Sequence, residues 1–299
     1  MFSFNKKGAI KPIAEIHGGP EDGELLYLHA KDPYSKSLKS GFFDEITLKP
    51  NQHFEFFPDV REDQTDCITL SGKKGVGKSV LASKLAQKMK EVFNLDDNDV
   101  IVVKKSDIED KAFKNLNPAY IYANDEFLEN PPTLDEITED GRPKVLILDD
   151  LDNIQSNKLK KAVVNFKDEL YREGRKFGVM VITCNHRMCS GKDTKAELTE
   201  SSYFLFFPAG ITSDFKYCLQ KYADLSLDFI RELKHEKSRW VMVHNESPMF
   251  ILSEKRALIF DGDREEDRLK DKKEEKKEKR EFRKLKKERK ESESSEEDY

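Results

Sequence analysis

The sequence lacks the hallmarks of membrane and secreted proteins. Its apolar runs fall far short of the roughly 20 residues that a membrane-spanning helix requires. The first residues, MFSFNKKGAIKPIAEIHGG, contain no apolar core of a signal peptide. We therefore expect a cytoplasmic location and no membrane partner. The four cysteines have no metal-ligand spacing, so we expect reduced thiols at Cys67, Cys184, Cys189 and Cys218.

The chain also lacks the positive charge that is typical of proteins coating nucleic acid. Its formal net charge is −5 over 299 residues, so any contact with DNA is expected to be local. Charged residues nevertheless make up 37% of the chain, well above the usual share. Many of them lie in residues 261–299, which have too few large apolar side chains to form a core. This composition predicts a charged tail that is partly helical or disordered.

Apolar segments in the middle of the chain alternate with amphipathic helices. The runs CITLSG, VIVV, KVLILDD, GVMVITCN and YFLFFP are typical of parallel strands buried on both faces. Residues 78–93 and 157–176 carry apolar side chains at helical spacing. We predict an α/β fold for residues 61–260, with a mostly parallel central sheet flanked by helices. Residues 1–60 contain short strand-like pieces and predict a small β-rich N-terminal segment.

The stretch SGKKGVGKSV joins the first of these strands to the first helix. It matches the P-loop pattern of nucleotide-binding proteins. Glycines allow backbone angles that direct successive N–H groups at phosphate oxygens, and the following helix adds its positive end. The lysine of the pattern reaches the β- and γ-phosphates, and its serine hydroxyl binds Mg²⁺. The predicted nucleotide-binding residues are Gly72, Lys73, Lys74, Gly75, Val76, Gly77, Lys78 and Ser79.

Two acids follow the apolar strand KVLIL. Asp149 stands at the carboxyl end of the strand, which faces the ligand in an open α/β sheet, and is predicted to hold Mg²⁺ with Ser79. Asp150 is predicted to orient and deprotonate an attacking water, the alternative being that it only caps the next helix. Asp152 is expected to be a helix cap or a solvated acid.

Polar residues also end the strand VMVITC. Asn185 is predicted to contact the γ-phosphate or the attacking water and to report hydrolysis to the rest of the molecule. His186 and Arg187 are expected to be ordinary loop residues. The Asn-Lys-x-Asp pattern with which GTPases read their base is absent, so ATP is favoured over GTP.

One further catalytic group is expected from an arginine. Arg175 lies at a glycine-marked helix end and is the candidate for an arginine that a neighbouring subunit supplies to the transition state. Arg172 is the weaker candidate, and both have the alternative of a surface position. Trp240, the single tryptophan, is expected in the core rather than stacked on a ligand.

Five segments occur in a characteristic order along residues 55–260. They are CITLSGKKGVGKS, VLILDDLDNI, ELYREGRKFGVMVITCNHR, ESSYFLFFPAG and SRWVMVHNESPMFILSEK. Together they resemble the poxvirus-type genome-packaging ATPases of large DNA viruses, in the FtsK–HerA group of P-loop motors. The sequence departs from that group at Lys73 and Lys74, where small residues are more usual, and at Lys176, where histidine is expected.

The resemblance implies an ATPase that assembles as a homo-oligomeric ring and drives double-stranded DNA into a preformed capsid. Its partners would be DNA and capsid or virion proteins, in the host-cell cytoplasm, a viral factory or the virion. Lys78 and Ser79 would act at the phosphates and Mg²⁺, Asp149 on Mg²⁺, Asp150 as the water-activating acid and Asn185 as the sensor.

Two other classes of function stay open from the sequence. The segment LDDLD also resembles the acidic strand of signalling-type ATPases that work as nucleotide-dependent switches or scaffolds, but the long helical and repeat extensions of that class are absent. A small-molecule kinase ranks third, because no arginine-rich lid is found.

Overall fold

The computed structural model of the chain describes residues 1–30, 41–61, 64–108 and 110–260. Residues 1–259 form one compact unit with two β-sheets. The charged tail predicted for residues 261–299 lies outside the described residues. The smaller sheet is antiparallel, with the strand order β1-β3-β2-β5. Its strands are β1 (Phe2–Ser3), β2 (Lys11–His17), β3 (Leu25–Leu28) and β5 (His53–Phe56).

The larger sheet has ten strands in the order β4-β14-β13-β12-β11-β6-β10-β9-β7-β8. Its parallel half runs from β11 to β8, and an antiparallel half continues from β12 to β4. The parallel half comprises β6 (Cys67–Ser71), β7 (Val100–Lys104), β8 (Ala119–Tyr122), β9 (Lys144–Asp149), β10 (Val179–Asn185) and β11 (Tyr203–Phe206). The antiparallel half adds β12 (Val241–His244), β13 (Phe250–Ser253), β14 (Arg256–Ile259) and β4 (Glu45–Thr47). The predicted α/β fold with a mostly parallel sheet is confirmed.

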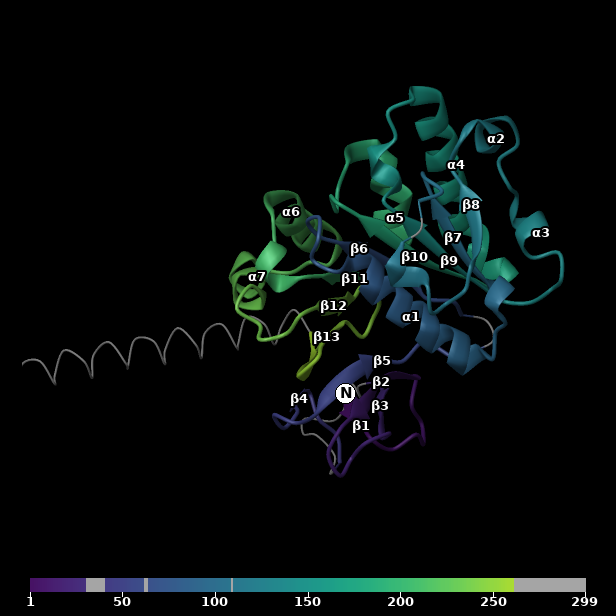
Figure 1. Cartoon of the computed structure of the whole chain (residues 1–299). Coiled ribbons are helices and arrows are strands. Elements are labelled where there is room, and N and C mark those ends of the chain that lie inside the picture. Colours follow the sequence, from purple (N-terminus) through teal and green to yellow (C-terminus); the bar gives the residue numbers. More distant parts are fainter. Residues whose placement is uncertain (31–40, 62–63, 109, 261–299) are drawn as a thin grey trace, which may run out of the picture. The chain divides into compact units, whose positions relative to one another are not determined.

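Two long helices cover opposite faces of the larger sheet, as Figure 1 shows. They are α1 (Lys78–Phe93) and α4 (Asn157–Glu173). Side chains of β9 alternate between the two cores, so that Val145 and Ile147 pack with α1 whereas Leu146 and Leu148 pack with α4. The remaining helices are α2 (Asp125–Glu129), α3 (Leu134–Ile137), α5 (Lys195–Glu200), α6 (Ser213–Tyr222) and α7 (Leu227–Leu233).

The small sheet shares the core that lies under α1. Ile13 of β2 and Phe54 of β5 belong to the same apolar cluster as Leu70 of β6 and Leu85 of α1. In addition, β4 pairs with β14 at the edge of the larger sheet. A boundary near residue 60 between two domains therefore stays a prediction, since residues on both sides of it form one core.

Two short elements have little signal in the sequence. The four residues of the edge strand β8 are only half-buried, so its apolar pattern is weak. The helix α3 lies within the proline- and acid-rich stretch ENPPTLDEITEDGRP, and it begins with a capping box between Thr133 and Glu136.

Candidate active site

The P-loop connects β6 to α1 at the carboxyl edge of the parallel strands. Gly75 and Gly77 have φ angles of 82° and 100°, which glycine adopts without strain. Gly72 is required for a different reason. A Cβ atom there would lie 2.8 Å from Val76 Cγ2 and 2.9 Å from Phe207 Cδ2, too close for any other residue. Two glycines of the pattern therefore allow the backbone angles of the loop, and Gly72 leaves room for the side chains of Val76 and Phe207.

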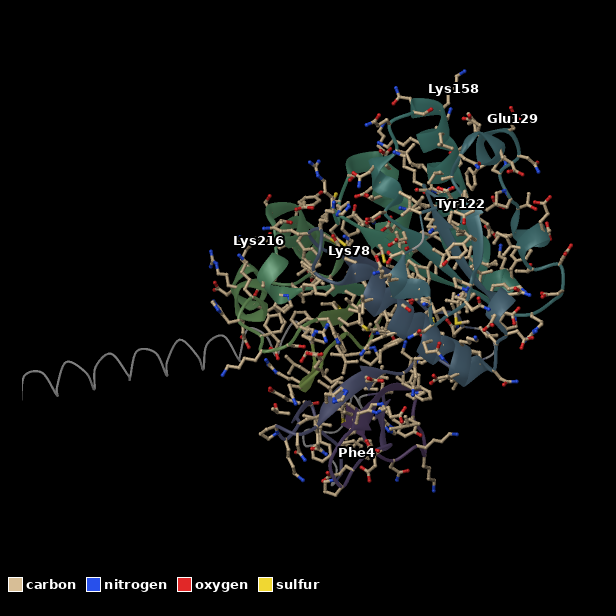
Figure 2. The ribbon with its side chains drawn as sticks, viewed as in Figure 1. Phe4, Lys78, Tyr122, Glu129, Lys158 and Lys216 are labelled. Carbon is tan, nitrogen blue, oxygen red and sulfur yellow. The ribbon has the colours of Figure 1, made fainter. Side chains whose placement is uncertain are left out.

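Lys78, labelled in Figure 2, is the first residue of α1, and its side chain is almost fully buried. Its Nζ atom donates to the Gly72 carbonyl oxygen at 3.2 Å and to His186 Nδ1 at 3.1 Å. Asp150 Oδ1 lies 3.7 Å from the same nitrogen. The P-loop lysine thus joins the loop to the ends of β9 and β10, where the other predicted site residues lie.

Ser79 and Asp149 come together as predicted for a metal site. The Ser79 hydroxyl donates to Asp149 Oδ1 at 3.2 Å. Burial, followed by the negative charge of Asp150, raises the pKa of Asp149 to about 6. A hydroxyl and a strongly destabilised carboxylate side by side are the oxygen donors that Mg²⁺ prefers, so the residues fit the ion. Ser79 and Asp149 would hold it, and it would neutralise charge on the phosphates.

Asp150 has an unusual backbone for a residue other than glycine. Its φ of 51° lies in the left-handed region, and its N–H donates to the Cys184 carbonyl oxygen at 3.2 Å. Its side chain makes no capping hydrogen bond to the turn that follows. Among the described residues, no group donates a hydrogen bond to its buried Oδ1 atom. A left-handed residue that holds a carboxylate oxygen without a donor is more consistent with a functional position than with a helix cap.

His186 was expected to be an ordinary loop residue, and this expectation is wrong. Its Nε2 atom lies 3.3 Å from Asp150 Oδ2, while Nδ1 faces Lys78. A lysine ammonium can only donate, so Nδ1 must accept and the proton of the neutral ring belongs on Nε2, where it can donate to Asp150. A polar residue directly after the sensor position was the signal available in the sequence, but only the fold shows its partners.

Asp152 also differs from its expected role as a cap or solvated acid. Its Oδ2 atom accepts the backbone N–H of His186 at 2.9 Å. The helix that follows is capped instead by Ser156, whose hydroxyl accepts the N–H of Leu159. Asp152 therefore positions the loop that carries His186. One potential metal-ligand atom from each of Asp150, Asp152 and His186 lies within 4.8 Å of those of the other two residues.

Asn185 is almost fully buried at the end of β10, where its amide nitrogen donates to Glu197 of α5. Its Oδ1 atom is buried without a hydrogen-bond donor among the described residues. Glu197 also accepts from Lys167 Nζ at 2.7 Å and from the Thr69 hydroxyl at 3.2 Å. No pattern in the sequence indicates Glu197, because it lies on a different element and meets Asn185 only through the fold.

Arg175 is the one predicted catalytic residue that the structure does not bring to the P-loop. It is exposed in the turn of residues 174–177, directly before β10, at the amino edge of the sheet. The strand that follows it separates the two edges by about 20 Å. Within one chain Arg175 cannot reach the phosphates, so its predicted role requires a second subunit. Arg172 is likewise exposed and lies 3.9 Å from Asp168.

The remaining expectations concern buried residues. All four cysteines are free thiols, and all but Cys189 are buried. Trp240 is 8% exposed and belongs to the core under α1. The free thiols and the core position of Trp240 are confirmed, whereas the prediction that no ligand stacks on Trp240 stays a prediction.

One family model matches part of the chain. It is the model of the ATPase family associated with various cellular activities (AAA), and it matches residues 68–193, from β6 to the loop after β10, which is less than half of the chain. Together with the parallel sheet and the P-loop, this match identifies the fold as that of P-loop NTPases. The matched residues include the P-loop, both acids after β9 and Asn185.

A virophage protein is similar to most of this chain. It is an uncharacterized protein, V3, of the Sputnik virophage, with 26% identity over 265 residues, covering 86% of this chain and 99% of the relative. The family model and this relative confirm that the resemblance seen in the motifs is to P-loop ATPases and extends to a viral protein.

Two of the solved structures with partial likeness to this chain are ATPases or NTPases by their descriptions. One is the genome-packaging NTPase B204 of Sulfolobus turreted icosahedral virus 2, with a TM-score of 0.45 and 15% identity over 64% of this chain and 98% of that one. The other is the cytoplasmic domain of the type VII secretion ATPase EccC of Thermomonospora curvata, with a TM-score of 0.43 and 14% identity over 84% of this chain and 28% of that one. Among the residues that the structure describes, no helix has both the length and the apolar character needed to cross a bilayer.

Proposed function

We propose that the chain is an ATP-hydrolysing motor that translocates double-stranded DNA into a viral capsid. The position of Asp150 is the observation that supports ATP hydrolysis. Its carboxylate lies 3.7 Å from the P-loop lysine and keeps one buried oxygen without a hydrogen-bond donor among the described residues. An acid at this place can accept a proton from a water that attacks the terminal phosphate.

The residues around Asp150 would bind the phosphates, position Asp150 and contact the attacking water. Lys78 would leave its bonds to His186 and Gly72 and turn to the phosphates when nucleotide enters, since a nucleotide phosphate is a stronger partner than a neutral imidazole or a carbonyl. His186 would then hold Asp150 in position through its Nε2–H. Asn185, with a buried oxygen that lacks a donor, would contact the attacking water or the γ-phosphate.

The buried contacts of Asn185 supply a route from chemistry to movement. Glu197 receives hydrogen bonds from Asn185 at the edge of the sheet, from Lys167 on α4 and from Thr69 on β6. A change at Asn185 on hydrolysis would therefore reach two helices and the P-loop strand through one carboxylate. A motor needs a link of this kind, because nucleotide state must change the positions of its surface elements.

DNA as the substrate, the ring and the capsid rest on the ordered motifs of residues 55–260 and on the viral relative. The position of Arg175 favours the ring, because this arginine can serve a phosphate site only on a neighbouring copy. We place the activity where viral genomes are packaged, in the host-cell cytoplasm, a viral factory or the virion.

Phosphate release from ATP and Mg²⁺, measured with and without double-stranded DNA, tests the proposal. We expect turnover that DNA stimulates, together with assembly that depends on nucleotide and is visible in a size measurement. The Lys78→Ala variant serves as the control for the site and should lose nucleotide binding. ATP turnover that does not change with DNA of any length at any salt concentration would contradict the proposal of a DNA-translocating motor.

The same assay separates the alternative functions. A switch or scaffold of the signalling type would hydrolyse ATP slowly and without a response to DNA. A small-molecule kinase would move phosphate to an added nucleoside rather than to water. The Asp150 carboxylate oxygen that has no hydrogen-bond donor among the described residues favours transfer to water over transfer to a nucleoside.

A further inference from the structure

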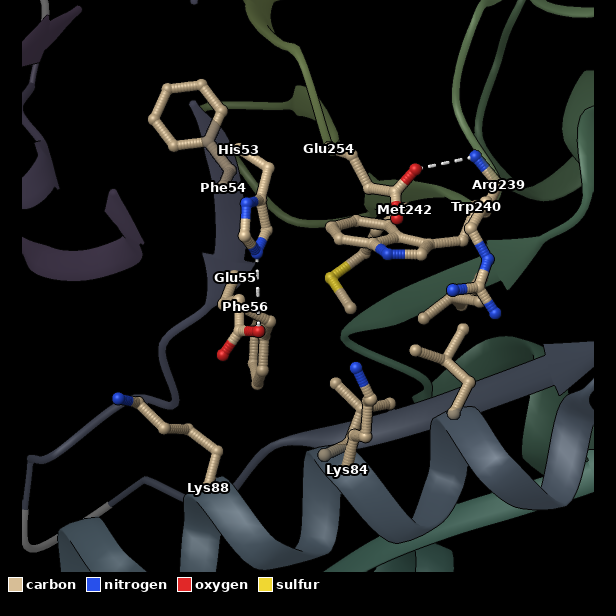
Figure 3. Close-up of a pocket in the computed structure, with 13 residues that line it drawn as sticks. His53, Phe54, Glu55, Phe56, Lys84, Lys88, Arg239, Trp240, Met242 and Glu254 are labelled. Carbon is tan, nitrogen blue, oxygen red and sulfur yellow. Dashed lines mark hydrogen bonds and ion pairs between the residues drawn. The ribbon is translucent and has the colours of Figure 1, made fainter. Parts of the chain in front are cut away.

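A cavity lies beside α1, apart from the phosphate residues. It has a volume of about 260 Å³ and lies between α1, β5 and the start of β12. Figure 3 shows Trp240, Met242 and Arg239 on one side of it, and Lys84 pointing toward the indole from α1. The predicted phosphate and metal residues do not line it, so the catalytic arrangement does not explain it.

The register of the sheet places one end of this cavity, at Arg239 and Trp240, at the ligand edge. Ser71 at the end of β6 pairs with Phe206 of β11, which in turn pairs with Val241 of β12. Trp240 directly precedes Val241 and therefore lies two strands from Gly72, the first residue of the P-loop. Two strand spacings amount to about 10 Å. A group attached to phosphates in the P-loop can reach across this distance.

The cavity also lies on the correct side of the P-loop for the rest of a nucleotide. In the strand order, β10 and β9 flank β6 on one side and carry Asn185, Asp149 and Asp150. These residues mark where the terminal phosphate and the metal belong. The strands β11 and β12, and with them the cavity, flank β6 on the other side. The nucleoside must leave the P-loop away from the terminal phosphate, toward β11 and β12.

The lining has the chemistry of a nucleoside site. Trp240, Met242 and Leu81 supply an apolar wall. Lys84 and Arg239 are exposed at the rim, and none of the described side chains forms an ion pair or a hydrogen bond with either cationic group. Lys88, at the far end, is by contrast already paired with Glu15. An apolar wall beside free cations suits a flat, electron-rich base and its sugar.

The backbone beside Trp240 is held in place. The Arg239 N–H donates to Glu254 Oε2 at 2.8 Å, and the Ser238 hydroxyl donates to the Trp240 carbonyl oxygen at 2.6 Å. The wall of the cavity is therefore formed before any ligand enters. A site formed in advance loses little conformational entropy on binding.

We propose that this cavity holds the nucleoside part of the bound nucleotide, with the base against Trp240 and Leu81, and Lys84 and Arg239 at its edge. The proposal rests on the proposed function, because it requires phosphates in the P-loop. It assigns a binding role to the antiparallel half of the sheet, which the catalytic residues do not use.

The single tryptophan makes the proposal directly measurable. The emission of Trp240 in the full chain is recorded while ADP with Mg²⁺ or inorganic tripolyphosphate with Mg²⁺ is added, and calorimetry gives the affinity of each. ADP should change the emission, whereas tripolyphosphate should bind without changing it. An equal change with both ligands would place the cause in the P-loop and overturn the proposal.

Two exposed variants test the rim without disturbing the core. Arg239→Ala and Lys84→Ala should each lower the affinity for ADP relative to that for tripolyphosphate by about threefold to tenfold, the usual range for a cation beside an aromatic system. Arg231→Ala removes an exposed arginine on α7 that pairs with Asp228, and should leave the ratio unchanged.

The possible failures are distinguishable. If ADP binds with unchanged Trp240 emission and the two rim variants keep the wild-type affinity ratio, the nucleoside proposal is wrong and the proposed function stands. If neither ADP nor tripolyphosphate binds, the P-loop site itself is wrong and both proposals fail.

Discussion

The two halves of the larger sheet differ in how many strand ends they place at the carboxyl edge of the parallel strands. Every strand of the parallel half ends at the same edge, so the P-loop, Asp149 and Asn185 meet there although they are far apart in the sequence. In the antiparallel half every second strand points the other way, and only connections such as residues 238–240 reach that edge. Parallel strands thus concentrate catalytic side chains, whereas the antiparallel strands supply a wall.

The halves also differ in their buried ionisable groups. In the parallel half, the pKa of Asp149 is raised from 3.8 to about 6, so stability falls as the pH rises through this interval. In the antiparallel half, burial and then the charge of Lys11 lower the pKa of His244 from 6.5 to about 3. Stability there falls as the pH drops from 6.5 toward 3. Each group favours its neutral form, and the two respond to acid in opposite directions.

The largest effect is expected from the buried network of the parallel half. Glu197→Ala leaves the charge of Lys167 buried without a partner and should lower the free energy of unfolding by about 3–5 kcal/mol. Denaturant unfolding measures the change. The double variant Glu197→Leu with Lys167→Met is the control, because removing both charges should restore most of the stability. If Glu197→Ala unfolds like the wild type, the network does not stabilise this half.

Next in size is the loss of the proposed general base. Asp150→Asn should bind nucleotide normally but lower turnover by about a hundredfold, since the amide cannot accept a proton from water. Single-turnover phosphate release and an ADP titration separate the two effects. Asp152→Asn is the matched neighbour. Its amide oxygen can still accept the His186 N–H, so a smaller loss of turnover is expected. Equal losses of turnover in the two variants would contradict the role of Asp150 as the general base.

The antiparallel half can be tested through its buried histidine. His244→Gln keeps an acceptor for Lys11 but cannot titrate, so it should flatten the loss of stability between pH 6.5 and pH 5. The expected difference in slope is about 1.4 kcal/mol per pH unit. Urea unfolding at several pH values gives both slopes. Parallel curves for the variant and the wild type would show that His244 is protonated in the folded protein.

The smallest expected change concerns the metal. Protons compete with Mg²⁺ for Asp149, so the apparent affinity for Mg²⁺ in the presence of ADP should fall by about tenfold per pH unit below pH 6. Mg²⁺ titrations followed by calorimetry at pH 5 and pH 7 provide the comparison. Asp149→Asn should bind Mg²⁺ weakly at both values. An affinity that is independent of pH in the wild type would exclude Asp149 as the ligand.

Local patterns in the sequence were sufficient for much of the fold and for part of the site. The apolar run that ends at Asp149 predicts a buried strand with an acid at its carboxyl end, and the spacing of Gly72, Gly77 and Lys78 predicts the P-loop. Each of these two signals is contained in a few consecutive residues. The edge strand β8 carries a weaker signal, because its side chains are half-buried and its apolar pattern is correspondingly weak.

Contacts between distant segments could not be predicted. His186 looks like a loop residue until the fold places it between Lys78 and Asp150. Glu197 is one acid among many in a chain with 58 acidic residues, and nothing near it in the sequence indicates that it will be buried. Arg175 stands at a suggestive helix end, but strand direction places it at the edge away from the phosphates.

The sequence by itself determined that a P-loop follows the strand CITLS, and that acids follow the strand KVLIL. Those features depend on the local backbone conformation and on the burial of a single strand. Both are determined by residues that are close together in the sequence. Only the tertiary structure decided which side chains surround the acids and where Arg175 lies, and it alone brought Trp240 to the same edge as the P-loop. These depend on strand order and direction, which arise from packing across the whole sheet.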